Sequence, residues 1–214
     1  MINEGYKAML GGKSVIRELS EYATARGSEI GYDNVFDYSL GNPSVPCPPS
    51  FTEAMIDLYR TAEPVALHGY SPSLGIPSVR ATIADSLNRR FGMDYTADYI
   101  FPTSGAAGAL AHALRAVTKP GDEIITFAPY FPEYQPYVAG TGARLTIVPA
   151  DTENFQINFA AFEAAMNPGV TAVLINTPNN PSGAVYSEET LERLAGILTA
   201  KQAEYGHDIF LISD

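Results

Sequence analysis

Two side chains that can bind one flat heterocycle stand at the ends of apolar segments. Asn180 lies in the run Thr-Pro-Asn-Asn-Pro-Ser-Gly at 177–183, after the apolar segment 170–176. Asp214 follows a second apolar segment, 209–213. As buried parallel strands, these segments would end at the sheet edge where open α/β sheets bind ligands. There Asn180 can donate to a phenolate-type oxygen, and Asp214 can pair with a protonated ring nitrogen. Asn-Pro-x-Gly is also a good strand-to-helix turn.

A second segment is suited to binding phosphate. The run Thr-Ser-Gly-Ala-Ala-Gly at 103–108 lies between a predicted strand and an alanine-rich helix. Its small side chains let a ligand approach the free amides at the helix start, with Gly105, Ala106 and Ala107 as donors. The motifs typical of nucleoside triphosphate and dinucleotide sites are absent from the sequence. An ordinary turn capped by Ser or Thr also fits this segment.

Three further motifs complete a pattern. They are Ser-Leu-Gly-Asn-Pro at 39–43, the run from Tyr70 through Gly75 to Val79-Arg80, and Ala-Pro-Tyr-Phe-Pro-Glu-Tyr at 128–134. In this order, with Asn180 and Asp214, they resemble the class I/II aminotransferases of fold type I, the aspartate aminotransferase family. The resemblance covers nearly all of residues 30–214.

The resemblance assigns roles to these residues. It implies pyridoxal 5'-phosphate as the cofactor, with Gly105, Ala106 and Ala107 on its phosphate. Phe131 would stack on the ring where many relatives have tryptophan, although Tyr130 or Tyr134 also fits that contact.

The remaining roles concern the substrate and the neighbouring subunit. Gly41 and Asn180 would contact the substrate, and Asp214 would be catalytic by keeping the ring nitrogen protonated. Tyr70 would reach the phosphate of the other subunit in a homodimer, and a buried structural role also fits it.

The implied activity is transfer of an amino group from an L-amino acid to a 2-oxo acid. A carbon–sulfur β-lyase shares every motif, and a non-catalytic aminotransferase-like domain is a further alternative. The family's Schiff-base lysine follows the aspartate by about thirty residues in a Ser-x-x-Lys context. None of the lysines here, at 7, 13, 119 and 201, has that context. We therefore expect the chain to be the N-terminal portion of a longer protein, truncated at Asp214.

Strand and helix patterns alternate along the chain, which predicts an α/β fold with a mostly parallel sheet and helices on both faces. Residues 1–50 are expected to form an N-terminal arm and small-domain segment, and residues 51–214 part of the large domain. Helices are predicted near 14–26, around Phe51, Met55 and Leu58, and along 79–91. The repeat that follows is strand 99–102, helix 106–118, strand 123–127, helix 132–139, strand 143–148, helix 159–166, strand 171–176, helix 188–204 and strand 209–213.

Composition narrows the protein class. The chain has 214 residues, a formal net charge of −11 and one cysteine. The acidic surface disfavours nucleic acid and anionic membranes as partners. The three histidines, at 68, 112 and 207, lack metal-ligand spacing, so no metal site is expected. With neither a signal peptide nor a long apolar segment, a soluble, cytoplasmic protein is predicted.

Overall fold

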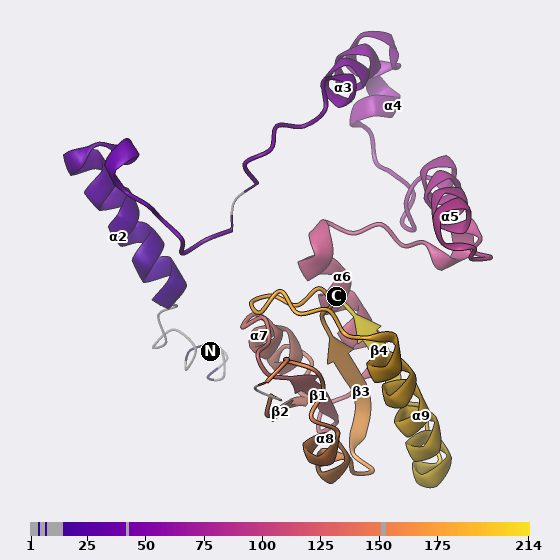
Figure 1. The fold of residues 1–214 in the computed structure, drawn as a ribbon. Helices are drawn as coiled ribbons and strands as arrows, with labels where there is room; N and C mark the ends of the chain where they lie inside the picture. The colour runs from indigo at the N-terminus through magenta and orange to yellow at the C-terminus, as the bar shows by residue number, and fades with distance from the viewer. Residues whose placement is uncertain (1–3, 5–6, 8–14, 42, 151–152) are drawn as a thin grey trace. The chain divides into compact units, whose positions relative to one another are not determined.

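The computed structural model describes residues 4, 7, 15–41, 43–150 and 153–214 (Figure 1). Lys13, Ser14 and Asn42, which carry parts of the predictions, lie outside the described residues. The chain divides into two compact units, Met1–Pro72 and Ser73–Asp214. The predicted division at residue 50 concerns the domains of the whole protein and stays a prediction.

The first unit is helical. Its elements are α2 (Val15–Ile30), η1 (Tyr32–Asn34), α3 (Pro49–Thr61) and α4 (Pro64–His68). Prolines open α3 and α4, where the missing N–H leaves no helical hydrogen bond unmade. Glu63 caps α4 by accepting from the Ala66 amide at 2.7 Å. The two helices predicted in this region are confirmed, and the first extends four residues beyond its predicted end at residue 26.

The second unit begins with α5 (Pro77–Phe91) and η2 (Ala97–Tyr99). The predicted strand at 99–102 is wrong. Tyr99, the first residue of this segment, ends a 3-10 helix that is capped by the Thr96 side chain. The remaining residues, 100–102, do not pair with any of the four described strands. Pro102 also has no N–H to give to a strand ladder.

Four parallel strands form the centre of the second unit, in the order β2-β1-β3-β4 (Figure 1). They are β1 (Glu123–Phe127), β2 (Arg144–Val148), β3 (Val170–Ile175) and β4 (Phe210–Ser213). The accompanying helices are α6 (Gly105–Val117), α7 (Tyr134–Ala139), α8 (Phe159–Ala165) and α9 (Glu188–Tyr205). The chain leaves β1 for β2 on one side and returns to β3 on the other, so β1 and β3 flank the topological switch point.

The sheet separates two apolar cores. Leu110 and Leu114 of α6 and Val138 of α7 pack with Ile124 and Leu174 on one face. The opposite face, which includes Ile125 and Val173, packs with α8 and α9. Because neighbouring strand residues point to opposite faces, burial on both sides explains why every residue of β3 except Thr171 is apolar. The predicted α/β fold with helices on both faces is confirmed.

The last helix forms as its sequence predicts. The Ser187 hydroxyl caps α9 by accepting from the Thr190 amide at 3.1 Å. Leu194 and Leu198 are buried against the sheet, with Leu191 partly buried beside them. Within the described ranges, no helix is both long and apolar enough to cross a membrane.

Candidate active site

The loops that leave β1 and β3 are tied together at the switch point. Asn179, only 9% exposed, donates from Nδ2 to the carbonyl oxygen of Pro129 at 3.1 Å. Its Oδ1 accepts from the amide of Ser182 at 3.1 Å and from the hydroxyl of Ser182 at 2.8 Å. One side chain thus fixes the loop carrying Phe131 against the loop carrying Asn180. This role of Asn179 was not predicted from the sequence, where the pair of asparagines at 179 and 180 is the only signal for it.

Asn176 connects Asn180 with Asp214 through its side chain. Its Oδ1 accepts from the backbone amide of Asn180, and its Nδ2 donates to the backbone oxygen of Asp214 at 3.3 Å. The Asp214 amide donates to the Ile175 oxygen at 2.9 Å, which continues the pairing of β4 with β3. The structure therefore brings Asn180 and Asp214 to one edge of the sheet. The Asn180 side chain makes no hydrogen bond with any other described residue, so its amide can serve a ligand.

Tyr134 contacts both Phe131 and Asp214, two of the predicted site residues. Its hydroxyl donates to Oδ2 of Asp214, and its ring meets the Phe131 ring edge-on at 5.7 Å. Burial, and then the hydrogen bond and charge of Asp214, raise the pKa of Tyr134 well above its ordinary value. The hydroxyl therefore remains a donor throughout the physiological pH range. The ring is 1% exposed in the core under α6 and α7, whereas Phe131 is only partly buried.

The start of α6 offers amides to an anion. Ser104 precedes the helix without a side-chain cap, and in the part of the chain described the amides of Ala106 and Ala107 have no partner. The Gly105 amide donates to the Thr103 oxygen at 3.1 Å. Gly105 has φ +75°, a conformation that favours glycine, and a Cβ there would meet no atom within 4 Å. The backbone is thus open to a close ligand, which fits a phosphate group.

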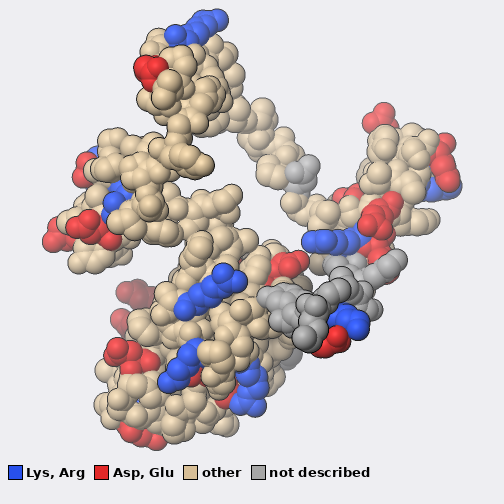
Figure 2. All heavy atoms as spheres, turned by 180° about the vertical axis from the view of Figure 1, so that it is seen from behind, with Lys and Arg blue, Asp and Glu red and all other residues tan. Residues whose placement is uncertain are grey.

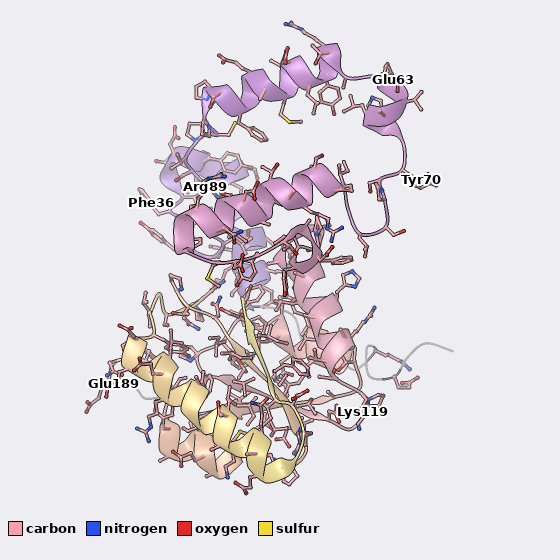
Figure 3. The ribbon with its side chains drawn as sticks, turned by 90° about the vertical axis from the view of Figure 1, so that its right-hand side faces the viewer. Phe36, Glu63, Tyr70, Arg89, Lys119 and Glu189 are labelled. Carbon is pink, nitrogen blue, oxygen red and sulfur yellow. The ribbon has the colours of Figure 1, made fainter. Side chains whose placement is uncertain are left out.

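Gly41 and Tyr70 belong to the other compact unit. Both are exposed, and Tyr70 lies in the segment that follows α4 (Figure 3). Their roles at the coenzyme site stay predictions.

The motif that begins at Tyr70 also contains structural residues. Arg80, 9% exposed, donates from Nε to the Ile100 oxygen at 2.8 Å. Gly75 has φ +90°, and a Cβ there would come within 2.9 Å of Cγ of Pro102. These contacts hold the start of α5 against the segment that leads into the turn before α6.

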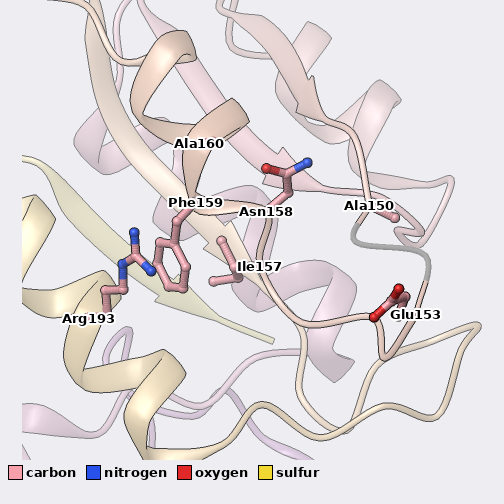
Figure 4. Close-up of a pocket in the computed structure, with 7 residues that line it drawn as sticks. All are labelled: Ala150, Glu153, Ile157, Asn158, Phe159, Ala160 and Arg193. Carbon is pink, nitrogen blue, oxygen red and sulfur yellow. The ribbon is translucent and has the colours of Figure 1, made fainter.

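A separate pocket of about 590 Å³ lies beside the start of α8 (Figure 4). Its basic side chain, Arg193, stacks over the Phe159 ring at 4.2 Å and pairs with Glu163 at 3.5 Å. These contacts give Arg193 a structural role.

On the face seen in Figure 2, acidic and basic side chains lie scattered among neutral ones.

Comparison with known proteins identifies the family of the chain. The family described as aminotransferase class I and II matches residues 33–205. The chain belongs to this family. A crystal structure of an aminotransferase from Eubacterium rectale is similar, with 46% identity and a TM-score of 0.95, over all of this chain and 54% of that one.

Other family members differ in their named activities. An aspartate aminotransferase from Thermotoga maritima is 32% identical over 183 residues, which are 85% of this chain and 46% of the relative. The structure of N-succinyldiaminopimelate aminotransferase from Mycobacterium tuberculosis is 29% identical, with a TM-score of 0.78, over 95% of this chain and 49% of that one. The chain spans about half the length of these aminotransferases.

The site of this family member fits pyridoxal phosphate in chemistry. Free amides at the start of α6 suit the phosphate, and the Asp214 carboxylate suits a protonated ring nitrogen. A free amide on Asn180 suits the ring oxygen, and the partly exposed Phe131 suits a flat ring.

Proposed function

We propose that this chain forms part of a pyridoxal 5'-phosphate-dependent aminotransferase that moves an amino group from an L-amino acid to a 2-oxo acid. The observation that carries the proposal is the placement of Asp214 and Asn180 at one sheet edge through Asn176. The named activities of the relatives support the reaction type.

Each residue of the site contributes one interaction. Bound pyridoxal phosphate supplies an electron-accepting ring, and the Asp214 carboxylate holds the proton on the nitrogen of that ring. Asn180 donates to the ring oxygen, and Phe131 packs on the ring face. The amides of Ala106 and Ala107, with Gly105 beside them, hold the phosphate.

The remaining parts of the proposal involve residues of the first unit and a part of the protein outside this chain. Gly41 contacts the substrate carboxylate, and Tyr70 reaches the phosphate site of a second subunit in a homodimer. The Schiff-base lysine comes from a part of the protein outside this chain. The protein is proposed to act in the cytoplasm.

The test uses the full-length protein loaded with pyridoxal phosphate and a panel of amino acids that includes aspartate, glutamate, methionine and cysteine. We expect the visible absorption band to be lost with one donor, with release of its 2-oxo acid and appearance of pyridoxamine phosphate. Release of pyruvate and ammonia without pyridoxamine phosphate would instead identify a β-lyase. A protein that binds no coenzyme would belong to the non-catalytic class.

The Asp214→Ala variant tests the central residue. Removing the carboxylate takes away the charge that holds the ring proton, so we expect weaker coenzyme retention and turnover lower by about 100-fold or more. Asp208→Ala removes an exposed carboxylate just before β4 and serves as the matched control. Unchanged turnover in Asp214→Ala would refute the assignment.

A further inference from the structure

In the part of the chain that the structure describes, the Asp214 carboxylate accepts a hydrogen bond from a single side chain. Among the described residues, only the Tyr134 hydroxyl donates a hydrogen bond to it, through Oδ2. The other oxygen, Oδ1, makes no hydrogen bond to the described part of the chain. A carboxylate rotates about its Cβ–Cγ bond, so a donor that engages one oxygen determines which direction the other oxygen faces.

Tyr134 is itself well fixed. Its ring is 1% exposed among residues of α6 and α7, and it meets the Phe131 ring edge-on and the Tyr130 ring stacked at 6.5 Å. It begins α7, whereas Asp214 follows β4, so the hydrogen bond links two elements that sequence separates by 80 residues. A rigid donor of this kind can orient a flexible acceptor.

We propose that Tyr134 is a positioning residue, whose hydroxyl orients the Asp214 carboxylate so that its free oxygen meets the ring nitrogen of the coenzyme. This inference rests on the proposed function. The Tyr134 ring also packs against Phe131. Tyr134 therefore supports Asp214, at the edge of the coenzyme ring, and Phe131, on the face of that ring.

Nearby tyrosines do not share this role. Tyr137 lies on the same helix. Burial, and then the negative charges of Glu133 and Asp214, raise the pKa of Tyr137, so the Asp214 carboxylate affects its hydroxyl electrostatically. No hydrogen bond joins it to Asp214 in the described structure. Tyr137→Phe is therefore a matched control that removes a hydroxyl near Asp214 without removing a contact to it.

The experiment is a double-mutant cycle in the full-length protein. The dissociation constant of pyridoxal phosphate is measured for Tyr134→Phe, Asp214→Asn and the combination, with the visible circular dichroism of the bound coenzyme as a second readout. A hydrogen bond to a charged group corresponds to a change of about tenfold or more. We expect Tyr134→Phe to weaken binding by about that factor and to reduce the dichroism per unit absorbance. In the Asp214→Asn background, its effect should fall below about twofold, because the partner charge is gone.

Each outcome has a clear meaning. Equal losses in both backgrounds would mean that the hydroxyl supports packing alone, and would overturn the inference. So would a Tyr134→Phe protein that matches Tyr137→Phe in affinity and dichroism. Thermal melting of the coenzyme-free variants reports any loss of fold separately. If the unmodified protein bound no pyridoxal phosphate, the proposed function would fail as well, whereas an additive cycle in an active aminotransferase would remove only the role of Tyr134.

Discussion

Replacing Asn179 with alanine should loosen both loops of the site at once. The change removes three hydrogen bonds, one to Pro129 and two from Ser182, at a residue that is 9% exposed. A net value of about 0.5–1.5 kcal/mol for each neutral bond gives an upper sum of about 4.5 kcal/mol. Water can replace part of this at the partly exposed Ser182. We therefore expect a loss of about 2 kcal/mol in the free energy of unfolding.

The Asn179→Asp variant separates the contact with Pro129 from the contacts with Ser182. It keeps an acceptor for Ser182 and loses the donor to Pro129, so it isolates the contact between the loops. Urea unfolding of the full-length protein without coenzyme measures stability, and titration with pyridoxal phosphate measures affinity. Asp94→Ala, at an exposed side chain that makes no hydrogen bond or ion pair with the described part of the chain, is the control and should change stability by less than about 0.5 kcal/mol.

We expect Asn179→Asp to lose both stability and coenzyme affinity, because the loop that carries Phe131 is no longer held. Wild-type affinity in Asn179→Asp would refute this reasoning and would limit Asn179 to a role within its own loop. Wild-type stability in Asn179→Ala would show that the bonds contribute nothing net.

Two further predictions concern the second unit. Gly75→Ala should lower the melting temperature more than Gly92→Ala, because both glycines have positive φ but only Gly75 would place a Cβ within 2.9 Å of Pro102; equal shifts would contradict the steric argument. Burial acts to raise the pKa of Glu123, but hydrogen bonds from Thr146, Asn167 and Arg144 outweigh it and lower the pKa from 4.5. A lowered folded-state pKa gives stability above the unfolded value that is lost as pH falls through the folded value. Urea unfolding should therefore find Glu123→Gln less stable than wild type at pH 7, with the gap closing below about pH 4.5; a gap that is independent of pH would contradict this.

Most elements of the sheet could be predicted from local patterns. The sequence of β3 is apolar except at Thr171 because both faces of the strand are buried, and α9 shows a leucine stripe behind a serine cap. The strand predicted at 99–102 fails for a non-local reason. A strand needs a neighbouring strand with which to form hydrogen bonds, and the apolar residues of a segment do not indicate whether such a neighbour is present.

The meeting of Asn180 and Asp214 at one sheet edge could be predicted from the sequence, but the side chains that support them could not. Strand ends and turn motifs placed Asn180 and Asp214 together, since parallel strands share an edge. The links made by Asn176 and Asn179 depend on how two loops fold against each other, which residue order does not reveal. For Tyr134, the pattern predicts an aromatic contact or a core position, and only the structure connects its hydroxyl to Asp214.

The strand order has a consequence for how the protein is made. β1, β2 and β3, with α6, α7 and α8, precede β4 in the chain, and both apolar cores draw mainly on these earlier elements. During synthesis they can begin to pack while Asp214 is still to be translated, since folding proceeds from the N-terminus as the chain emerges from the ribosome. The partner of Tyr134 arrives 80 residues later, with β4. Within this chain, the proposed coenzyme half-site would gain Asp214 last, so pyridoxal phosphate would select nascent chains whose sheet has already taken up its fourth strand and would leave earlier folding species unstabilised.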